Sequence, residues 1–396
     1  MHTLLTPHNI LPHDHDQAVL IARIWTEGLG PTLVRVREDH IYDISHLAAT
    51  STDLLEMADP VGTVREYGGA HIANTAAVLA NSAQENRDPA TPWFLAPCDL
   101  QAIKAAGVTF VASMLERVIE EQARGDAGRA EAVRRSVVHV IGDNLRSVKP
   151  GSAQAAHLRE VLIQQGVWSQ YLEVGIGEDA EIFTKAQPMS AVGVGAEIGL
   201  HPKSVWNNPE PEIVLAVNSR GETRGCALGN DVNLRDFEGR SALLLGKAKD
   251  NNASAAIGPF IRLFDEHFGI DDVRQCELAM RVTSADGGFE MQGASSLSMI
   301  SRDPLDLVNQ AMGEPDQRTH QYPDGFMLYL GTMFAPTQDR HGPGQGFTHA
   351  LGDLVSVSTP RLGTLVNRVN HSNQVAPWSY GIAALMRDLA RRGLLA

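Results

Sequence analysis

The chain has 396 residues, of which 43% are hydrophobic and 20% charged, a composition typical of globular rather than disordered proteins. This length is enough for two domains of ordinary size. Acidic residues outnumber Lys and Arg by 47 to 33, giving a net charge of −14. Because this charge would repel a phosphate backbone and no basic stripe is present, we expect no nucleic-acid partner.

The cysteines and the N-terminal segment bear on the cellular compartment. Cys98, Cys226 and Cys276 lie far apart and show no CxxC spacing, which argues against a disulfide framework and a thiolate zinc site. No apolar run approaches the roughly 18 residues of a membrane span. The N-terminal segment lacks the basic start and the cleavage site of a signal peptide. We therefore expect a cytoplasmic protein without a membrane partner.

Residues 1–95 are predicted to form a small N-terminal α+β domain. The segment 33–46, "LVRVREDHIYDISH", alternates apolar and polar residues on both sides of Glu38-Asp39, a pattern that indicates a β-hairpin. The next two segments, "STDLLEMADPVGTVREYG" and "AHIANTAAVLANSAQ", are expected to form short helices, the first opened by a Ser/Thr/Asp cap. Several prolines follow, and we place a domain boundary near residue 95.

The rest of the chain, 96–396, is predicted to change from helices to short strands. A helical segment is expected at about 110–170, and strands separated by Gly and Pro follow from Ala180. The segment 256–269, "AIGPFIRLFDEHFG", is expected to be a loop that leads into a short helix, and 377–395 a closing helix. Many short strands with few helices between them indicate an α+β protein with a β-rich roll or sandwich.

The segment 207–217, "NNPEPEIVLAV", places two carboxylates at the start of a predicted strand. Residues i and i+2 of a strand point to the same side, so Glu210 and Glu212 would lie together. Asp231 ends the next strand-like run and would join them if the two strands are neighbours. Three carboxylate ligands suit Mg²⁺, with Mn²⁺ or Ca²⁺ as alternatives. The other interpretation is a solvated strand entrance and a turn residue, because exposed acids are common.

Five motifs in a fixed order resemble the fumarylacetoacetate hydrolase family. They are "EPEIVLAV", "GNDVNLRD", "GK…IGP", "LGT" and "GDLVSVSTPRLGTLVNRV". The similarity covers roughly residues 105–370, and "HIYDISHLAATSTDLLE" also resembles the small N-terminal domain of that family. The resemblance implies a mixed β-sandwich roll and a homodimer or larger homo-oligomer. It also implies that Glu210, Glu212 and Asp231 are metal ligands.

The resemblance also assigns a lysine and its partner. Lys247 matches the family lysine near the metal-bound substrate oxygen, where an ammonium group would offset developing negative charge. Asp250 matches the usual partner of that lysine. Lys249 is a rival for the same place, because the loop that follows is longer than in the family pattern.

Further residues of the substrate pocket follow from the same resemblance. Thr332 matches a family threonine that holds the substrate carboxylate. Lys185 and Ser190 match a loop that lines the pocket, although the residues between them differ from the family pattern. Arg235 and Asp236 follow the metal aspartate and are interpreted as supporting residues.

One departure from the family pattern bears on the reaction. The family's C–C hydrolases carry G-x-N-Y-x-x-H-x-x-E, whose His and Glu activate water, and here 107–116 reads "GVTFVASMLE". Ser113 replaces the histidine and Glu116 is retained, so the usual base at neutral pH is missing. This favours dehydration and is similar to the 2-keto-3-deoxy-pentonate dehydratases of the family. Glu116 would then be the acid/base, with Ser113 assisting by a hydrogen bond.

The sequence therefore predicts a magnesium-dependent dehydratase, a lyase, acting on a small 2-oxo acid. It would convert 2-keto-3-deoxy-D-pentonate to 2,5-dioxopentanoate and water through a metal-stabilised enolate. Two alternatives within the family are an acylpyruvate-type C–C hydrolase, with His341 or His349 as the base, and a 2-oxo acid decarboxylase. A third alternative is a non-catalytic oligomer that is stabilised by the metal.

Overall fold

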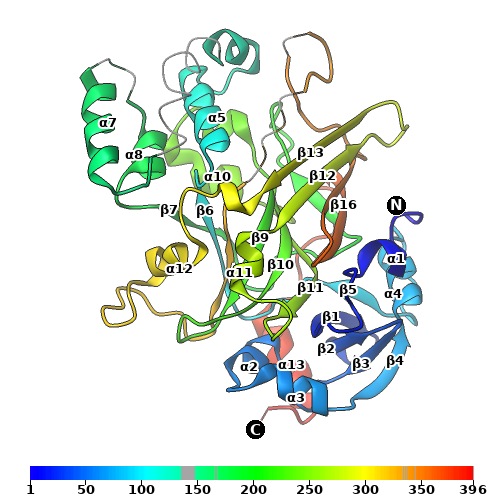
Figure 1. Ribbon diagram of the computed structural model, residues 1–396. Helices are drawn as coiled ribbons and strands as arrows, with labels where there is room; N and C mark the ends of the chain where they lie inside the picture. Colours follow the sequence, from blue (N-terminus) through cyan, green and yellow to red (C-terminus); the bar gives the residue numbers. More distant parts are fainter. Residues whose placement is uncertain are drawn as a thin grey trace.

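Two β-sheets flanked by helices make up the fold in the computed structural model (Figure 1). The structure describes residues 1–134, 148–164, 166, 168–332, 334, 336, 338–343 and 345–395. The predicted α+β class is confirmed, whereas residues 135–147 of the predicted helical segment lie outside the described residues. No helix within the described ranges is long and apolar enough to cross a membrane.

The larger sheet contains strands from residue 20 to residue 329. Its strand order is β4-β3-β2-β1-β11-β10-β9-β14-β6-β7, and β5 pairs with β1. All neighbouring pairs are antiparallel except β14 and β6. The strands are β1 (Leu20–Thr26), β2 (Gly30–Arg37), β3 (His40–Asp43), β4 (Ala70–Asn74), β5 (Trp93–Leu95), β6 (Ala102–Gly107), β7 (Glu181–Ala186), β9 (Pro211–Val217), β10 (Thr223–Asp231), β11 (Ala255–Leu263) and β14 (Phe326–Tyr329).

The smaller sheet has the strand order β13-β12-β15-β16-β8. Its strands are β8 (Glu197–Leu200), β12 (Glu277–Thr283), β13 (Glu290–Ser296), β15 (Leu354–Thr359) and β16 (Gly363–His371). Residues of β12 alternate between exposed and buried, because one face packs inward and the other faces solvent. Leu228 of the larger sheet and Val357 of the smaller sheet belong to one buried apolar cluster, so the main core lies between the sheets.

Helices cover the sheets at several places (Figure 1). They are α1 (Pro7–Ile10), α2 (Ser51–Glu56), α3 (Pro60–Glu66), α4 (Thr75–Ser82), α5 (Val111–Gln122), α7 (Ala153–Gln164), α8 (Gln170–Ile176), α9 (Arg235–Glu238), α10 (Leu245–Lys249), α11 (Ile270–Arg274), α12 (Pro304–Met312) and α13 (Ile382–Arg391). Short 3₁₀ turns span Ala242–Leu244 and Leu297–Met299. Helices α5 and α8 share a separate apolar cluster that includes Met114, Val118 and Leu172.

The predicted hairpin at 33–46 is confirmed. Strands β2 and β3 pair with Val36 opposite Ile41, and Glu38 takes a positive φ of 55° in the turn. The first segment predicted as a helix, 51–68, forms two helices, α2 and α3, and the Thr50 side chain caps α2 by accepting a hydrogen bond from the Asp53 N–H. The second, 70–84, is helical only from Thr75, as α4, and the prediction is wrong for its first five residues, which form β4.

The prediction of a loop at 256–269 is wrong. Its first half forms β11, in which every residue is buried between β1 and β10. Gly258-Pro259 suggested a turn, but the register with β10 shifts between Cys226 and Leu228, opposite this pair. A strand tolerates a proline at such an irregularity, because the missing N–H falls where the ladder is interrupted.

The larger sheet continues across the predicted domain boundary near residue 95. Strand β1 pairs with β11 through Leu20 and Ile21, which lie opposite Arg262 and Ile261. After helix α13, Arg392 donates a hydrogen bond to the Pro31 carbonyl at 3.2 Å. The division at residue 95 and the description of 96–396 as a sandwich roll stay predictions.

Candidate metal centre and active site

The three predicted ligand residues lie together where β9 and β10 meet. Glu212 lies opposite Gly229 in the antiparallel ladder, and the Asp231 N–H donates to the Glu210 carbonyl at 2.9 Å. One carboxylate oxygen from each of the three residues lies within 4.8 Å of the others. All three residues are only 1–2% exposed, so the interpretation as a solvated strand entrance is wrong. Their role as metal ligands stays a prediction.

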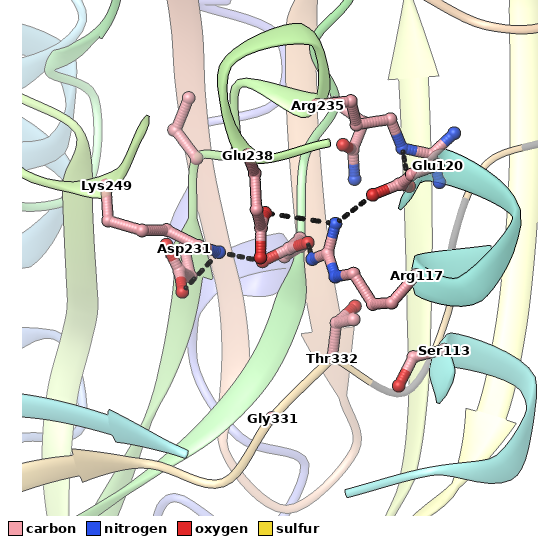
Figure 2. A network of polar contacts seen from close by, with 12 residues as sticks. Ser113, Arg117, Glu120, Asp231, Arg235, Glu238, Lys249, Gly331 and Thr332 are labelled. Carbon is pink, nitrogen blue, oxygen red and sulfur yellow. Dashed lines mark hydrogen bonds and ion pairs between the residues drawn. The ribbon is translucent and has the colours of Figure 1, made fainter. Parts of the chain in front are cut away.

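Two buried lysines contact these carboxylates. The Lys249 ammonium lies 2.6 Å from Glu210 Oε2 and 3.0 Å from Asp231 Oδ2 (Figure 2). Lys185, which is completely buried, lies 2.8 Å from Asp231 Oδ1. Burial alone would raise the pKa of Glu210, but the charges of Arg117 and Lys249 more than offset it and lower the pKa to about 2.

Glu212 differs from Glu210 in having no cationic partner among the described residues. Its Oε2 accepts a hydrogen bond from the Gly331 N–H at 2.7 Å. Burial, together with the nearby charges of Asp231 and Glu210, raises the pKa of Glu212 well above its ordinary value. The cluster therefore presents hard oxygen donors, of which the Glu212 carboxyl group is not paired with a cation among the described residues. That donor set fits a divalent cation such as Mg²⁺.

Helix α5 supplies a buried arginine that sequence analysis did not assign. Arg117 Nη2 contacts Glu210 Oε1, while its Nη1 lies 2.7 Å from Glu120 Oε2 and 3.2 Å from Glu238 Oε2. Arg235 Nε lies 2.9 Å from the other oxygen of Glu120. Figure 2 shows the Arg117 guanidinium between the carboxylates of Glu120 and Glu238.

A helical spacing could have pointed to this arginine. Ser113, Arg117 and Glu120 stand at i, i+4 and i+7, which places them on one face of α5. All three are buried, while Met114 and Val118 pack in the apolar cluster shared with α8. The buried side of α5 therefore carries charged side chains as well as apolar ones.

The two α5 residues proposed for catalysis have other partners in the structure. Ser113 Oγ donates a hydrogen bond to the Phe110 carbonyl at 3.0 Å. Both oxygens of Glu116 are held by Arg134, at 2.7 and 3.1 Å. Glu116 is therefore engaged away from the three carboxylates.

Lys249, rather than Lys247, is the lysine of α10 that reaches the carboxylates. Lys247 is exposed, with its ammonium 5.9 Å from the centre of the Phe237 ring. Residues two apart on a helix face different directions, so only one of the two lysines can point inward. Asp250 is exposed and accepts a hydrogen bond from Gln187 at 3.0 Å. The structure thus places neither Lys247 nor Asp250 in the cluster.

The predicted substrate-binding residues fall into two places. Thr332 is buried next to Gly331, whose N–H binds Glu212. Ser190 is half-buried, and its hydroxyl donates to the Gln187 carbonyl at 2.7 Å within its own loop. Thr332 therefore follows the residue that binds Glu212, and its hydroxyl donates to the Phe334 carbonyl at 2.9 Å. Ser190 has no described contact with the candidate metal ligands.

Glu181, the first residue of β7, is a second residue that sequence analysis missed. Burial and the charge of Glu238 raise its pKa to about 7, while Arg117 and Lys249 act in the opposite direction. Its carboxylate makes no hydrogen bond or ion pair with any residue that the structure describes. A carboxyl group that titrates near neutrality and is not committed to a partner is a candidate for proton transfer.

The position of Glu181 follows from the strand that carries it. Glu181 begins β7 and lies opposite Gly107 of β6 in the antiparallel ladder. A Cβ on Gly107 of β6 would lie only 1.8 Å from Glu181 Oε2, so this side chain fits because residue 107 is glycine. The ladder shifts register between Ile103 and Lys104, opposite Lys185, so simple alternation along β7 does not connect Lys185 with Glu181.

Comparison with curated proteins finds two distant relatives. A probable 2-keto-3-deoxyxylonate dehydratase from Haloferax volcanii is 30% identical over 199 residues, which cover 50% of this chain and 63% of that protein. A 2-dehydro-3-deoxy-D-arabinonate dehydratase from Saccharolobus solfataricus is 27% identical over 195 residues, which cover 49% of this chain and 60% of that protein. Both matches span less than two thirds of the relatives. No family model matches the sequence.

Solved structures show the same fold. A 2-keto-3-deoxy-D-arabinonate dehydratase complexed with magnesium and 2,5-dioxopentanoate has a TM-score of 0.60 at 19% identity, covering 89% of this chain and 99% of that chain. A fumarylacetoacetate hydrolase from Exiguobacterium antarcticum has a TM-score of 0.51 at 16% identity, covering 89% and 100%.

Proposed function

We propose that this protein is a magnesium-dependent dehydratase. Its fold is that of the fumarylacetoacetate hydrolase family, and its sequence is distantly homologous to 2-keto-3-deoxy-pentonate dehydratases. It would convert 2-keto-3-deoxy-D-pentonate to 2,5-dioxopentanoate and water. The observation that carries the proposal is the buried convergence of Glu210, Glu212 and Asp231. The names of both curated relatives support the same reaction class.

Glu210, Glu212 and Asp231 would hold the Mg²⁺ ion, with Mn²⁺ or Ca²⁺ as substitutes. When bound, the ion supplies Lewis acidity at the 2-keto oxygen of the substrate, which makes the C3 protons more acidic. The ammonium group of Lys249, held between Glu210 and Asp231, adds positive charge beside the same position.

Dehydration requires one proton to leave C3 and the C4 hydroxyl to depart as water. The resulting C3–C4 double bond moves to C4–C5 as a proton leaves C5 and a proton adds to C3. The enol so formed becomes the aldehyde of the product when its O–H proton leaves and a proton adds to C4. Glu181 suits this proton transfer, because a pKa of about 7 lets one carboxyl group accept and return a proton at neutral pH. Glu116 stays a second candidate, but it would first have to leave Arg134.

The remaining predicted residues divide into supporting and binding roles. Lys185 donates to the Val232 carbonyl at 3.2 Å and contacts Asp231, so it holds Asp231 in place. Thr332 lies next to the backbone that binds Glu212 and is proposed to hold the substrate carboxylate. Ser113 would line the pocket near it. Ser190 and Asp250 have no described contact with the three carboxylates, and their role in substrate binding stays a prediction.

The proposal is tested by incubating the pure protein with Mg²⁺ and 2-keto-3-deoxy-D-pentonate. An aldehyde dehydrogenase specific for 2,5-dioxopentanoate reports the product. We expect a signal that disappears with a chelator and in the Glu212→Gln variant. No signal from the pentonate, but release of pyruvate from an acylpyruvate, would replace the dehydratase with a hydrolase.

One observation favours that hydrolase as the second candidate. His349 is buried, its Nδ1 lies 3.3 Å from Asp353 Oδ2, and its Nε2 has no hydrogen-bond partner among the described residues. Burial lowers its pKa, which keeps the imidazole neutral and able to act as a base. His341 is exposed and gives no comparable support.

A further inference from the structure

A chain of buried side chains with alternating charge runs through the candidate metal centre (Figure 2). Each member is in ion-pair contact with the next, and every member is at most 6% exposed. In order, the members are Lys185, Asp231, Lys249, Glu210, Arg117, Glu120 and Arg235. Glu238 adds a branch at Arg117.

Arg117 is the link in this chain between helix α5 and the metal centre. One end of its guanidinium contacts Glu210, and the other lies between Glu120 and Glu238. The five N–H donors of a guanidinium point in fixed directions within one plane. A guanidinium held by two carboxylates on one side therefore fixes the position of a third carboxylate on the other.

We propose that Arg117 is a positioning residue for the metal centre, which holds the Glu210 carboxylate facing Glu212 and Asp231. The inference rests on the proposed function in so far as that function assigns these three carboxylates to a divalent ion. It adds a residue from a separate helix, 93 positions away from Glu210 in sequence.

An arginine beside a metal ligand could also weaken binding by repelling the cation. Here Arg117 contacts three carboxylates, Glu120, Glu210 and Glu238, and shares Glu120 with Arg235 and Glu210 with Lys249. A variant that keeps the positive charge therefore separates orientation of Glu210 from repulsion of the cation. Partners that orient metal ligands typically contribute about 10- to 100-fold to metal affinity.

The test compares two charge-conserving variants, Arg117→Lys and Arg235→Lys. Lysine keeps the charge but lacks the planar fork, so any change in affinity reports geometry rather than repulsion. Arg235 is the matched control, because it binds the same Glu120 without touching a carboxylate of the metal centre. Mn²⁺ is titrated into each full-length protein, and free and bound ion are measured by electron paramagnetic resonance.

We expect Arg117→Lys to raise the Mn²⁺ dissociation constant about 10- to 100-fold, and Arg235→Lys to change it less than about twofold. Unchanged binding in Arg117→Lys overturns the inference, and so does equal weakening in both variants. Wild-type protein that binds no Mn²⁺ overturns both this inference and the proposed metal site. Wild-type protein that binds Mn²⁺ but does not dehydrate the pentonate overturns only the proposed function.

A second pair of variants covers the case in which Arg117→Lys does not fold, because it leaves buried carboxylates poorly paired. The double variant Arg117→Lys/Glu238→Gln removes one of those charges and is compared with Glu238→Gln alone. The single variant keeps the contact between Arg117 and Glu210. We expect the Mn²⁺ dissociation constant of the double variant to be about 10- to 100-fold higher than that of Glu238→Gln alone. A ratio of these two constants near one contradicts the inference.

Discussion

Glu181 and Lys185 both belong to β7, so one strand carries a carboxyl group with a pKa of about 7 and the lysine that binds Asp231. The lysine is committed to Asp231, whereas the carboxyl group has no described partner. This difference separates a structural role from a role in proton transfer.

Replacement of Glu181 tests that role. Glu181→Gln keeps the shape of the side chain but cannot accept a proton, so we expect the turnover rate to fall about 10²- to 10⁴-fold. In the wild-type enzyme, a base with a pKa of about 7 predicts that the rate rises as the pH increases through 7. The matched control is Glu116→Gln, measured in the same coupled assay. A larger loss in Glu116→Gln than in Glu181→Gln would transfer the role to Glu116.

The two lysines of α10 should behave differently. Lys249→Met removes the ammonium group between Glu210 and Asp231 and leaves two like charges buried, so we expect loss of activity and a stability loss of about 3–5 kcal/mol in metal-free protein. Lys247→Met changes an exposed side chain and should leave both quantities nearly unchanged. Urea unfolding measures the stability, and the coupled assay measures the activity. Equal effects of the two substitutions would contradict the assignment of Lys249.

Divalent metal should stabilise the folded protein. At a free Mg²⁺ concentration 100 times its dissociation constant, linkage predicts about 2.7 kcal/mol of additional stability. Chelator should remove this gain, and Glu212→Gln should not show it. Glu266→Gln is a suitable control, because Glu266 is exposed and pairs with Arg65 away from the cluster. Thermal melts with and without a 2-oxo acid then separate an enzyme from a metal-stabilised oligomer, since only the enzyme gains further stability from the acid.

Asp353 predicts part of the acid sensitivity of the fold. Burial alone would raise its pKa, but Arg340 and His349 more than offset this and lower it to about 2. Because the folded pKa lies below the ordinary value of 3.8, the stabilisation is present above about pH 4 and is lost as the pH falls towards 2. Denaturant melts of wild type and Asp353→Asn across this range measure it. The difference between the two proteins should shrink as the pH falls, and a constant difference would contradict the assignment.

The sequence predicts contacts that arise within one hairpin better than contacts between distant segments. Alternation at the start of β9 indicated that Glu210 and Glu212 lie together, and Asp231 joins them because β9 and β10 pair, a condition that the sequence left open. The contact between Arg117 and Glu210 depends on where α5 packs against the sheet, which no local spacing encodes. The resemblance selected Lys247, but the turn of α10 decided which lysine faces inward. Strand β11 was missed because Gly258-Pro259 suggests a turn unless the irregular ladder with β10 is known.

The pairing of β1 with β11 has a consequence for how the chain is made. Ile21 and its partner Ile261 are separated by 261 − 21 = 240 positions. At synthesis rates of about 5–20 residues per second, the edge of β1 that pairs with β11 therefore stays unpaired for on the order of 10–50 s, until β11 has been synthesised. Strands β2 and β5 arrive early and can pair with β1 elsewhere, but the remaining exposed edge is a site where nascent chains can associate. Protection of this edge during translation should therefore govern the yield of native protein.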